Sequence, residues 1–427
     1  MLRRLLNRLL DWLMLAPGVV LVGAALVSAA LRPGRRQGRP RAVFGPTPII
    51  SLSGISRAMR SRGYVADTLV HQPYRINQLS DFDLLIDDLP LVRSLHRLKA
   101  APLARRIAPY AAFAYALPRY DLFHSFFDGG MLMGSPLAWL EPLLLHATGR
   151  KLVVMPYGSD CAIPSRIQSL PWRHGLMDQY SHLGRHEART TRRVQHLCRH
   201  ADHVVACMVH AETLPRWDSL TNTYYPIDTA AWPMTPHRPT ADGVGEEVVV
   251  GHSPNHRLVK GTAFLVAAVE RLRQQGLRIR LELMEGIPNG EVRQRLAQCD
   301  ILVEQLHLGY ALSAMEGLAL GRPVISNLED ERYYRVHRQH TGLDQCPIVS
   351  SGPERIEEHL RRLATDPELR QRLGEAGRAY AETYHSMAAT GRFWDLLWRH
   401  LWGNGTITRK DLLTWHPLRD YPDDHSW

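Results

Sequence analysis

The stretch that decides the fold occupies residues 308–325 and reads LGYALSAMEGLALGRPVI. A glycine-bearing loop leads into a short apolar helix, expected at 313–320, and a proline-started strand follows at 323–326. Strands joined by helices are the unit of a parallel sheet. Glu316 interrupts the apolar helix, and burying a carboxylate is costly unless it binds something. A ribose diol is one such partner, and a glutamate on the solvated side of the helix is the alternative.

The same alternation of strands and helices extends in both directions from this stretch. Downstream of residue 245, it predicts strands at 247–251, 278–284, 301–304 and 323–326 and helices at 262–273, 291–297 and 313–320. Upstream, it predicts strands at 41–44, 66–70, 82–86, 121–124, 152–155 and 203–207. The expected fold class is therefore α/β, with two doubly wound Rossmann-like domains that face each other across a cleft.

The length of 427 residues exceeds what a single hydrophobic core usually covers. A polar, aperiodic stretch with three prolines predicts a linker between two domains. The expected parts are an N-terminal segment at 1–40, a first domain at 41–229, a linker at 230–245, a second domain at 246–385 and a C-terminal helix and tail at 386–427. That helix, expected at 393–402, gathers aromatic and leucine side chains close to one face, for packing on the protein or for membrane contact.

Residues 12–31 form an apolar run without a charged side chain, long enough to cross a bilayer core of about 30 Å as a helix. Pro17, Gly18 and Gly23 dilute the run, so a helix lying in the membrane interface is an alternative. A cleavable secretory signal is a third interpretation. If the run spans, the arginines that flank it place the rest of the chain on the cytoplasmic side of a membrane. These flanking residues are Arg3, Arg4, Arg8, Arg32, Arg35, Arg36, Arg39 and Arg41.

The formal net charge of +10 is concentrated near the N-terminus, which favours an anionic membrane surface over nucleic acid as a partner. No basic helix interleaved with aromatics and no RNA-binding consensus supports a nucleic-acid partner. The five cysteines are scattered, without the short spacing that a zinc site or a redox dithiol requires. We therefore expect neither nucleic-acid binding nor a metal site.

The loop after the expected strand at 247–251 carries two cations, Arg257 and Lys260, at the start of the next helix. Open parallel sheets bind ligands beyond the carboxyl ends of their strands. A nucleotide diphosphate needs cations or helix N-terminal amides close to its phosphates. The pair either neutralises such phosphates or is simply solvated, and spacing alone does not decide between the two.

The order of Arg257 and Lys260-Gly261, then Gly286-Ile287-Pro288, Asp300-Ile301 and 309–324 resembles that of the family 4 glycosyltransferases. The likeness extends upstream to 226–229 and downstream to 366–380, and it is looser in the first domain. The resemblance implies a retaining, metal-independent hexosyltransferase of the two-Rossmann GT-B architecture. It implies no cofactor, because the nucleotide sugar is a substrate. The donor would bind mainly to the second domain and the acceptor to the first.

The resemblance also implies roles for individual residues. Lys260 and Arg257 would neutralise the donor diphosphate, and Glu316 would hold the ribose. His124 would contact the transferred sugar or help to handle the acceptor proton, unless it is a strand-end histidine satisfied by backbone. The backbone around Gly45, Pro46 and Thr47 would approach the diphosphate from the first domain. Further donor-side candidates are Gly309, Tyr310, Leu312 and Ser313, and the acceptor-side candidates are Asp128 and Asp160.

One position departs from the family pattern. Members typically carry a paired glutamate eight positions before the one that matches Glu316, and this chain has Leu308 there. Either Glu304 or Gln305 substitutes for it, or activity has been lost. The expected function is glycosyl transfer to a lipid-linked or polysaccharide acceptor. The alternatives are a silent homologue that binds nucleotide sugar or a partner enzyme, and a sugar-nucleotide epimerase, for which the sequence offers no assignable acid and base groups.

Overall fold

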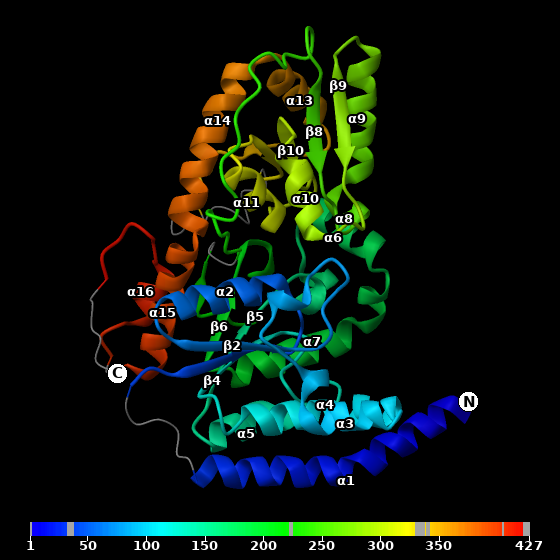
Figure 1. The fold of residues 1–427 in the computed structure, drawn as a ribbon, viewed down its shortest axis with the longest axis vertical. Helices are drawn as coiled ribbons and strands as arrows, with labels where there is room; N and C mark the ends of the chain where they lie inside the picture. The colour runs from blue at the N-terminus through cyan, green and yellow to red at the C-terminus, as the bar shows by residue number, and fades with distance from the viewer. Residues whose placement is uncertain are drawn as a thin grey trace.

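The protein contains two parallel β-sheets with helices packed against them. The structure is a computed structural model and describes residues 2–31, 38–221, 225–328, 338, 342–403 and 405–421. The second sheet stands above the first in Figure 1. The predicted α/β class with two doubly wound domains is confirmed.

The first sheet has the strand order β3-β2-β1-β4-β5-β6-β7. Its strands are β1 (Arg41–Phe44), β2 (Val65–Val70), β3 (Leu84–Leu85), β4 (Leu122–Phe126), β5 (Lys151–Met155), β6 (His203–Ala206) and β7 (Ser219–Leu220). All of its recorded pairings are parallel, and Phe44 of β1 lies opposite His124 of β4. The direction of strand order reverses between β1 and β4, so the loops after these two strands flank the position where doubly wound sheets bind ligands.

Helices cover both faces of the first sheet, because its strand side chains are apolar on both. On one face lies α2 (Ile50–Ser61), and on the other lie α4 (Ala101–Ala116), α5 (Glu141–Ala147) and α7 (His182–His200). Two further helices pack against this layer: α3 (Pro90–Arg97) contacts α4, and α6 (Leu170–Gln179) contacts α7. The site-bearing loops are thus anchored in a two-sided core.

The second sheet has the order β12-β11-β10-β8-β9 and is also parallel. Its strands are β8 (Val248–His252), β9 (Ile279–Leu283), β10 (Ile301–Val303), β11 (Val324–Ser326) and β12 (Val349–Ser350). Its helices are α8 (Arg257–Lys260), α9 (Thr262–Gln274), α10 (Asn289–Leu296), α11 (Leu312–Ala319), α13 (Ile356–Thr365) and α14 (Pro367–Tyr380). Here the strand order reverses between β8 and β10, so the loops after these two strands flank a second position of the kind where doubly wound sheets bind ligands.

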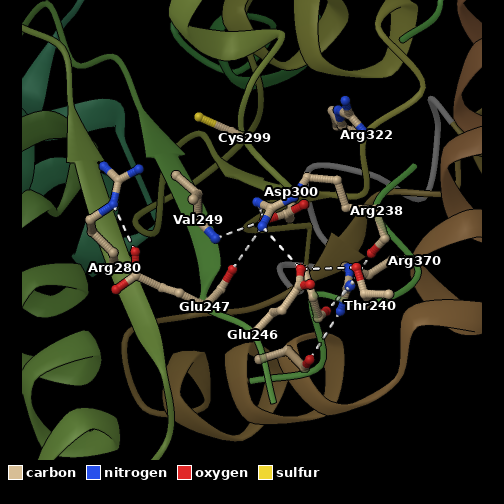
Figure 2. Close-up of polar contacts among 12 residues, drawn as sticks. Arg238, Thr240, Glu246, Glu247, Val249, Arg280, Cys299, Asp300, Arg322 and Arg370 are labelled. Atoms are coloured by element: carbon tan, nitrogen blue, oxygen red, sulfur yellow. Dashed lines mark hydrogen bonds and ion pairs between the residues drawn. The ribbon is translucent and has the colours of Figure 1, made fainter. Parts of the chain in front are cut away.

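The stretch predicted as a linker is held against the second domain by arginine side chains, of which Arg322 and Arg370 are buried and Arg238 is exposed (Figure 2). Arg238 pairs with Asp300 at 3.0 Å, and the Asp300 carboxylate also accepts from the Val249 N–H. Arg322 donates to the Pro236 carbonyl at 3.0 Å, and Arg370 donates to the Arg238 carbonyl at 3.3 Å. These bonds satisfy carbonyls that an irregular segment would otherwise leave unpaired.

The last long helix, α15 (Met387–Trp402), returns to the first domain and packs against α2. Trp394 and Trp398 are completely buried, and the Trp398 ring meets Tyr64 edge-on at 4.9 Å. Of the two interpretations of this helix, packing on the body of the protein is the one observed.

The N-terminal helix, α1 (Leu2–Leu31), lies along α4 at the edge of the first domain (Figure 1). Gly18 lies so close to Tyr110 that an added Cβ would come within 2.7 Å of its ring. Val22 and Ala29 are buried in the same contact, and Arg106 donates to Asp11 at 2.8 Å. The section Leu10–Leu31 is long and apolar enough to cross a membrane, by length and composition alone.

The buried indole of α15 yields a stability prediction. We expect Trp398→Ala to lower the free energy of unfolding by about 3 to 5 kcal/mol, because it leaves a cavity among α2, α15 and the sheet. Urea denaturation followed by fluorescence measures the loss. The control is Leu418→Ala, since Leu418 is 66% exposed. Equal midpoints for the two variants would contradict the packing described.

Candidate functional site

The loops at the switch point of the second sheet bring Lys260 and Glu304 together. Lys260 ends α8, which follows β8, and Glu304 directly follows β10. The Lys260 ammonium pairs with the Glu304 carboxylate, with side-chain exposures of only 11% and 0%. A nearly dry ion pair needs further hydrogen bonds to offset its desolvation.

Glu304 obtains these bonds from the loop that leads into α11 and from the end of β11. Its carboxylate accepts from the Ala311 N–H at 3.2 Å, from Ser313 Oγ at 3.1 Å and from Ser326 Oγ at 3.4 Å. The first amides of a helix have no intrahelical acceptor. The N-terminus of α11 and the Lys260 ammonium are therefore held beside each other, which is an arrangement suited to an anion.

Glu316 lies one turn after Ser313 on α11 and is half-buried. Burial, followed by the negative charge of Glu304, raises the pKa of Glu316 to about 8, while the Lys260 charge opposes the shift. A carboxyl group with this pKa is largely protonated at neutral pH and can donate as well as accept a hydrogen bond. This environment differs from that of a solvated glutamate.

Arg257 stands at the edge of this group. Its Nε and Nη2 atoms each lie 2.6 Å from the carboxylate of Glu285, and its side chain is 57% exposed. The Glu285 carboxylate raises the pKa of Arg257. A diphosphate would have to share this guanidinium with Glu285, as it would share the Lys260 ammonium with Glu304. Of the two cations, Lys260 is the one linked to α11, because Ser313 also donates to Glu304.

The remaining candidates on this loop divide into backbone and core positions. Gly309 has a φ of 84° and donates its N–H to the Asn327 carbonyl at 2.7 Å, while Leu312 begins α11. Tyr310 is 2% exposed and packs near His385, which counts against the predicted contact with a donor. Leu308 is likewise buried, at 1% exposure.

The first-domain loop after β1 differs from the expectation at Gly45 and Pro46, whereas the expectation for the Thr47 amide stays a prediction. The Gly45 N–H donates to the His124 carbonyl at 3.0 Å, and proline has no N–H. An added Cβ at Gly45 would lie 2.0 Å from the Leu69 carbonyl oxygen. The amide of Gly45 thus holds β1 against β4 and is not available to a diphosphate.

The predicted role of His124 also conflicts with the geometry. Its ring is completely buried, stacks on Phe44 at 4.3 Å and lies 3.0 Å from the donating Nε1 of Trp398. Burial holds the pKa of His124 well below its usual value. A neutral histidine buried beneath α15 does not reach a sugar. The alternative of a histidine satisfied by backbone is not observed either, because Nε2 accepts from the Trp398 indole and Nδ1 has no partner among the described residues.

The two acceptor-side aspartates have different surroundings. Asp160 is 4% exposed, and its oxygens accept from the N–H groups of Phe127, Tyr157 and Gly158 at 2.9 to 3.0 Å. It therefore shapes the loop, and burial raises its pKa to about 7. Asp128 Oδ2 accepts from Thr47 Oγ1 at 2.7 Å, whereas its Oδ1 is buried without a partner in the described part of the chain.

Sequence reasoning understated Glu304 and missed Ser326. Glu304 was considered only as a substitute for the missing carboxylate, yet it joins α8, α11 and β11. Both residues lie at strand ends of the second switch point, which is the signal that could have identified them.

No protein family model and no curated protein matches the sequence. Among solved structures, the chain is similar to Anabaena HepE in complex with UDP and glucose, with a TM-score of 0.51 and 15% identity over 84% of this chain and 98% of that one. It is also similar to a glycosyltransferase from Rickettsia africae, with a TM-score of 0.50 and 11% identity over 86% of this chain and 99% of that one. The chain therefore has a glycosyltransferase-like fold of the GT-B type.

The raised pKa of Glu316 predicts a pH-dependent stability difference. Its unfolded-state pKa lies near 4.5 and its folded-state pKa near 8, so the folded protein loses stability as the pH rises between these values. Glu316→Gln removes this loss, and its melting temperature should rise relative to the wild type from pH 5 to pH 8. Exposed Glu354, changed to Gln, is the control. If the difference in melting temperature between Glu316→Gln and the wild type does not change with pH, the raised pKa of Glu316 is contradicted.

Proposed function

We propose that this protein is a glycosyltransferase, related to family 4, that transfers a hexosyl group from a nucleotide sugar with retention of configuration. The observation that carries the proposal is the Lys260 ammonium held by Glu304 beside the N-terminus of α11. A charged leaving group needs such preorganised positive charge in a site of low polarity. The HepE complex with UDP and glucose shares the fold and supports a nucleotide-sugar donor.

In this mechanism the donor diphosphate lies against Lys260 and the N-terminus of α11, beside the Glu304 carboxylate that joins them. As the bond from the sugar to the diphosphate breaks, negative charge grows on the leaving nucleoside diphosphate, and these groups stabilise it. Glu316 hydrogen-bonds the ribose hydroxyls, and Arg257 contributes a second, more distant cation. The nucleotide sugar is a substrate, and no other cofactor is invoked.

A silent homologue is the second candidate, and Leu308 favours it. The leucine is buried in the hydrophobic core of the second domain and offers no carboxylate to a donor sugar. Glu304 is the compensating carboxylate in the active interpretation, because its oxygens lie within reach of Lys260 and Ser313. Donor turnover distinguishes the two candidates.

The donor site predicts a nucleotide-dependent stabilisation that requires Lys260. A nucleoside diphosphate at about one hundred times its dissociation constant should stabilise the protein by about 2.7 kcal/mol. Lys260→Ala should abolish the rise in melting temperature, because the diphosphate loses its nearest cation. Thermal denaturation against UDP, GDP, ADP and their glucose conjugates measures the effect.

The matched control is Lys410→Ala, since Lys410 is an exposed lysine on α16 (Arg409–Leu413). This variant should respond to nucleotide as the wild type does. If a nucleotide still stabilises Lys260→Ala, the proposal that the diphosphate binds beside Lys260 is contradicted. Stabilisation without sugar turnover would favour the silent homologue.

We further propose that the protein works on the cytoplasmic side of a membrane, with α1 lying in the interface. One face of α1 is buried on α4 through Gly18, Val22 and Ala29, so a spanning α1 would draw the charged surface around α4 into the bilayer. The opposite face is apolar and exposed, and an in-plane helix would bury it among lipids. Its exposed large side chains are Trp12, Leu13, Val19, Val20, Val27 and Leu31. An acceptor linked to lipid would be reached from this position.

This orientation predicts peripheral binding to anionic vesicles. Full-length protein should sediment with them and be released by alkaline carbonate, which leaves spanning helices in place. Val20→Asp with Val27→Asp should reduce binding at least tenfold, because the charges would enter the apolar region. Val244→Asp is the control, since Val244 is 72% exposed in the linker. Retention after carbonate treatment would contradict an in-plane helix.

A further inference from the structure

A cavity of about 360 Å³ lies in the first domain, between the loop after β4 and the helices α5 and α7. It is distinct from the Lys260 site, which belongs to the second domain. The residues that matter for its chemistry are Asp128, Trp139, Glu141, Arg189, Arg193 and His196. Its volume is within the range of small-molecule sites.

One wall of the cavity is a row of cationic or cation-capable side chains on α7. Arg189, Arg193 and His196 recur at intervals of four and three residues, which places them on one face of the helix. Arg193 Nη2 donates to the Asp160 carbonyl at 2.9 Å, but its Nε is buried without a partner among the described residues. His196 Nε2 is also buried and unpartnered in the described chain. Unpaired buried polar atoms are costly, so this wall lacks an acceptor.

The cavity lining also includes a carboxyl group, that of Asp128. Asp128 Oδ1, like Arg193 Nε and His196 Nε2, is a buried atom of the cavity lining without a hydrogen-bond partner in the described ranges, and burial raises the pKa of this carboxyl. Its other oxygen is held by Thr47, at the switch point of the first sheet. A hydroxyl group can donate to a carboxylate or accept from a carboxylic acid at this position.

The loop after β4, which lines the cavity, is fixed by Glu141. This buried carboxylate accepts from the N–H groups of Met131 and Leu132 at 2.8 and 2.7 Å. An added Cβ at Gly130 would lie 2.3 Å from Glu141 Oε1, so the loop closes tightly on it. The cavity is therefore preformed.

An exposed indole stands at the cavity wall. Trp139 is 47% exposed, and its ring meets His196 edge-on at 4.8 Å. Leu140 and Leu143 next to it are also about half exposed. An aromatic face beside hydrogen-bonding groups suits a sugar ring or the start of an alkyl chain.

We propose that this cavity binds the acceptor as a glycosyl phosphate, with the phosphate on Arg189, Arg193 and His196 and a sugar hydroxyl on Asp128. The inference rests on the proposed transferase function and names its acceptor class. Two guanidinium groups and an imidazole on one wall match a phosphate better than a neutral glycan. The same chemistry is present in a free sugar phosphate and in a lipid-linked one.

The test is calorimetric titration of the full-length protein with glucose 1-phosphate, mannose 1-phosphate and N-acetylglucosamine 1-phosphate. Methyl glucoside and inorganic phosphate serve as the neutral and sugar-free probes. At least one sugar phosphate should bind at least tenfold more tightly than both. Arg193→Gln and Arg189→Gln should each weaken it at least tenfold, whereas Arg192→Gln should not, because Arg192 is exposed outside the cavity.

The titration also distinguishes a free sugar phosphate from a lipid-linked one. Together with the nucleotide experiment, it shows whether a negative result concerns the acceptor site alone or the donor site as well. Tighter binding of the octyl ester of the same sugar phosphate would assign the lipid-linked form, and equal binding the free form. Binding by no sugar phosphate, equal binding of inorganic phosphate or methyl glucoside, or unchanged binding in Arg193→Gln and Arg189→Gln would overturn the proposal. The rise in melting temperature with UDP, and its dependence on Lys260, is measured on the same preparations. It shows whether the donor site binds nucleotide even if the cavity binds no sugar phosphate.

Discussion

The buried carboxylate of Glu304 is the constraint on which the second domain's site depends. A carboxylate whose side chain is 0% exposed is tolerated only with strong partners, and here they come from Lys260, Ala311, Ser313 and Ser326. These partners lie on α8, on the loop before α11, on α11 and on β11. One desolvated charge therefore fixes the relative positions of a cation and a helix N-terminus, so little reorganisation is left for the moment when a ligand's negative charge develops.

The two domains are joined by chain crossings as well as by surface contact. The segment entering the second domain and the segment leaving it meet where the Ile227 N–H donates to the His385 carbonyl at 2.8 Å. Beyond this point α15 completes the core of the first domain, and Trp398 reaches His124 across 274 residues of sequence. The core of the first domain thus requires the C-terminal segment, so the first domain is not complete without the chain that follows the second domain.

Local patterns predicted most of the strands, because a buried parallel strand is a mainly apolar run, as in β1 and β8. They missed the two-residue edge strands β7 and β12, which are too short to form such a run. The cationic loop was likewise visible, since Lys260 lies between a strand and a helix in the sequence itself. His124 was misjudged because its environment is made by Trp398, and no local pattern reports such a distant contact. Gly45 was misjudged for a similar reason: its N–H is bonded to the carbonyl of a strand nearly eighty residues away.

The N-terminal helix α1 and the proposed acceptor cavity belong to the same side of the first sheet. α1 packs on α4, and the cavity lies between α5 and α7, which share one face of the sheet with α4. The Arg150 guanidinium, at the start of β5, reaches the Ala29 carbonyl near the end of α1 at 3.5 Å. If α1 lies in the interface, the helical layer that contains the cavity faces the lipid surface, while Asp128 remains at the carboxyl edge of the sheet. A lipid-linked acceptor could then keep its chain in the membrane while its sugar extends toward that edge.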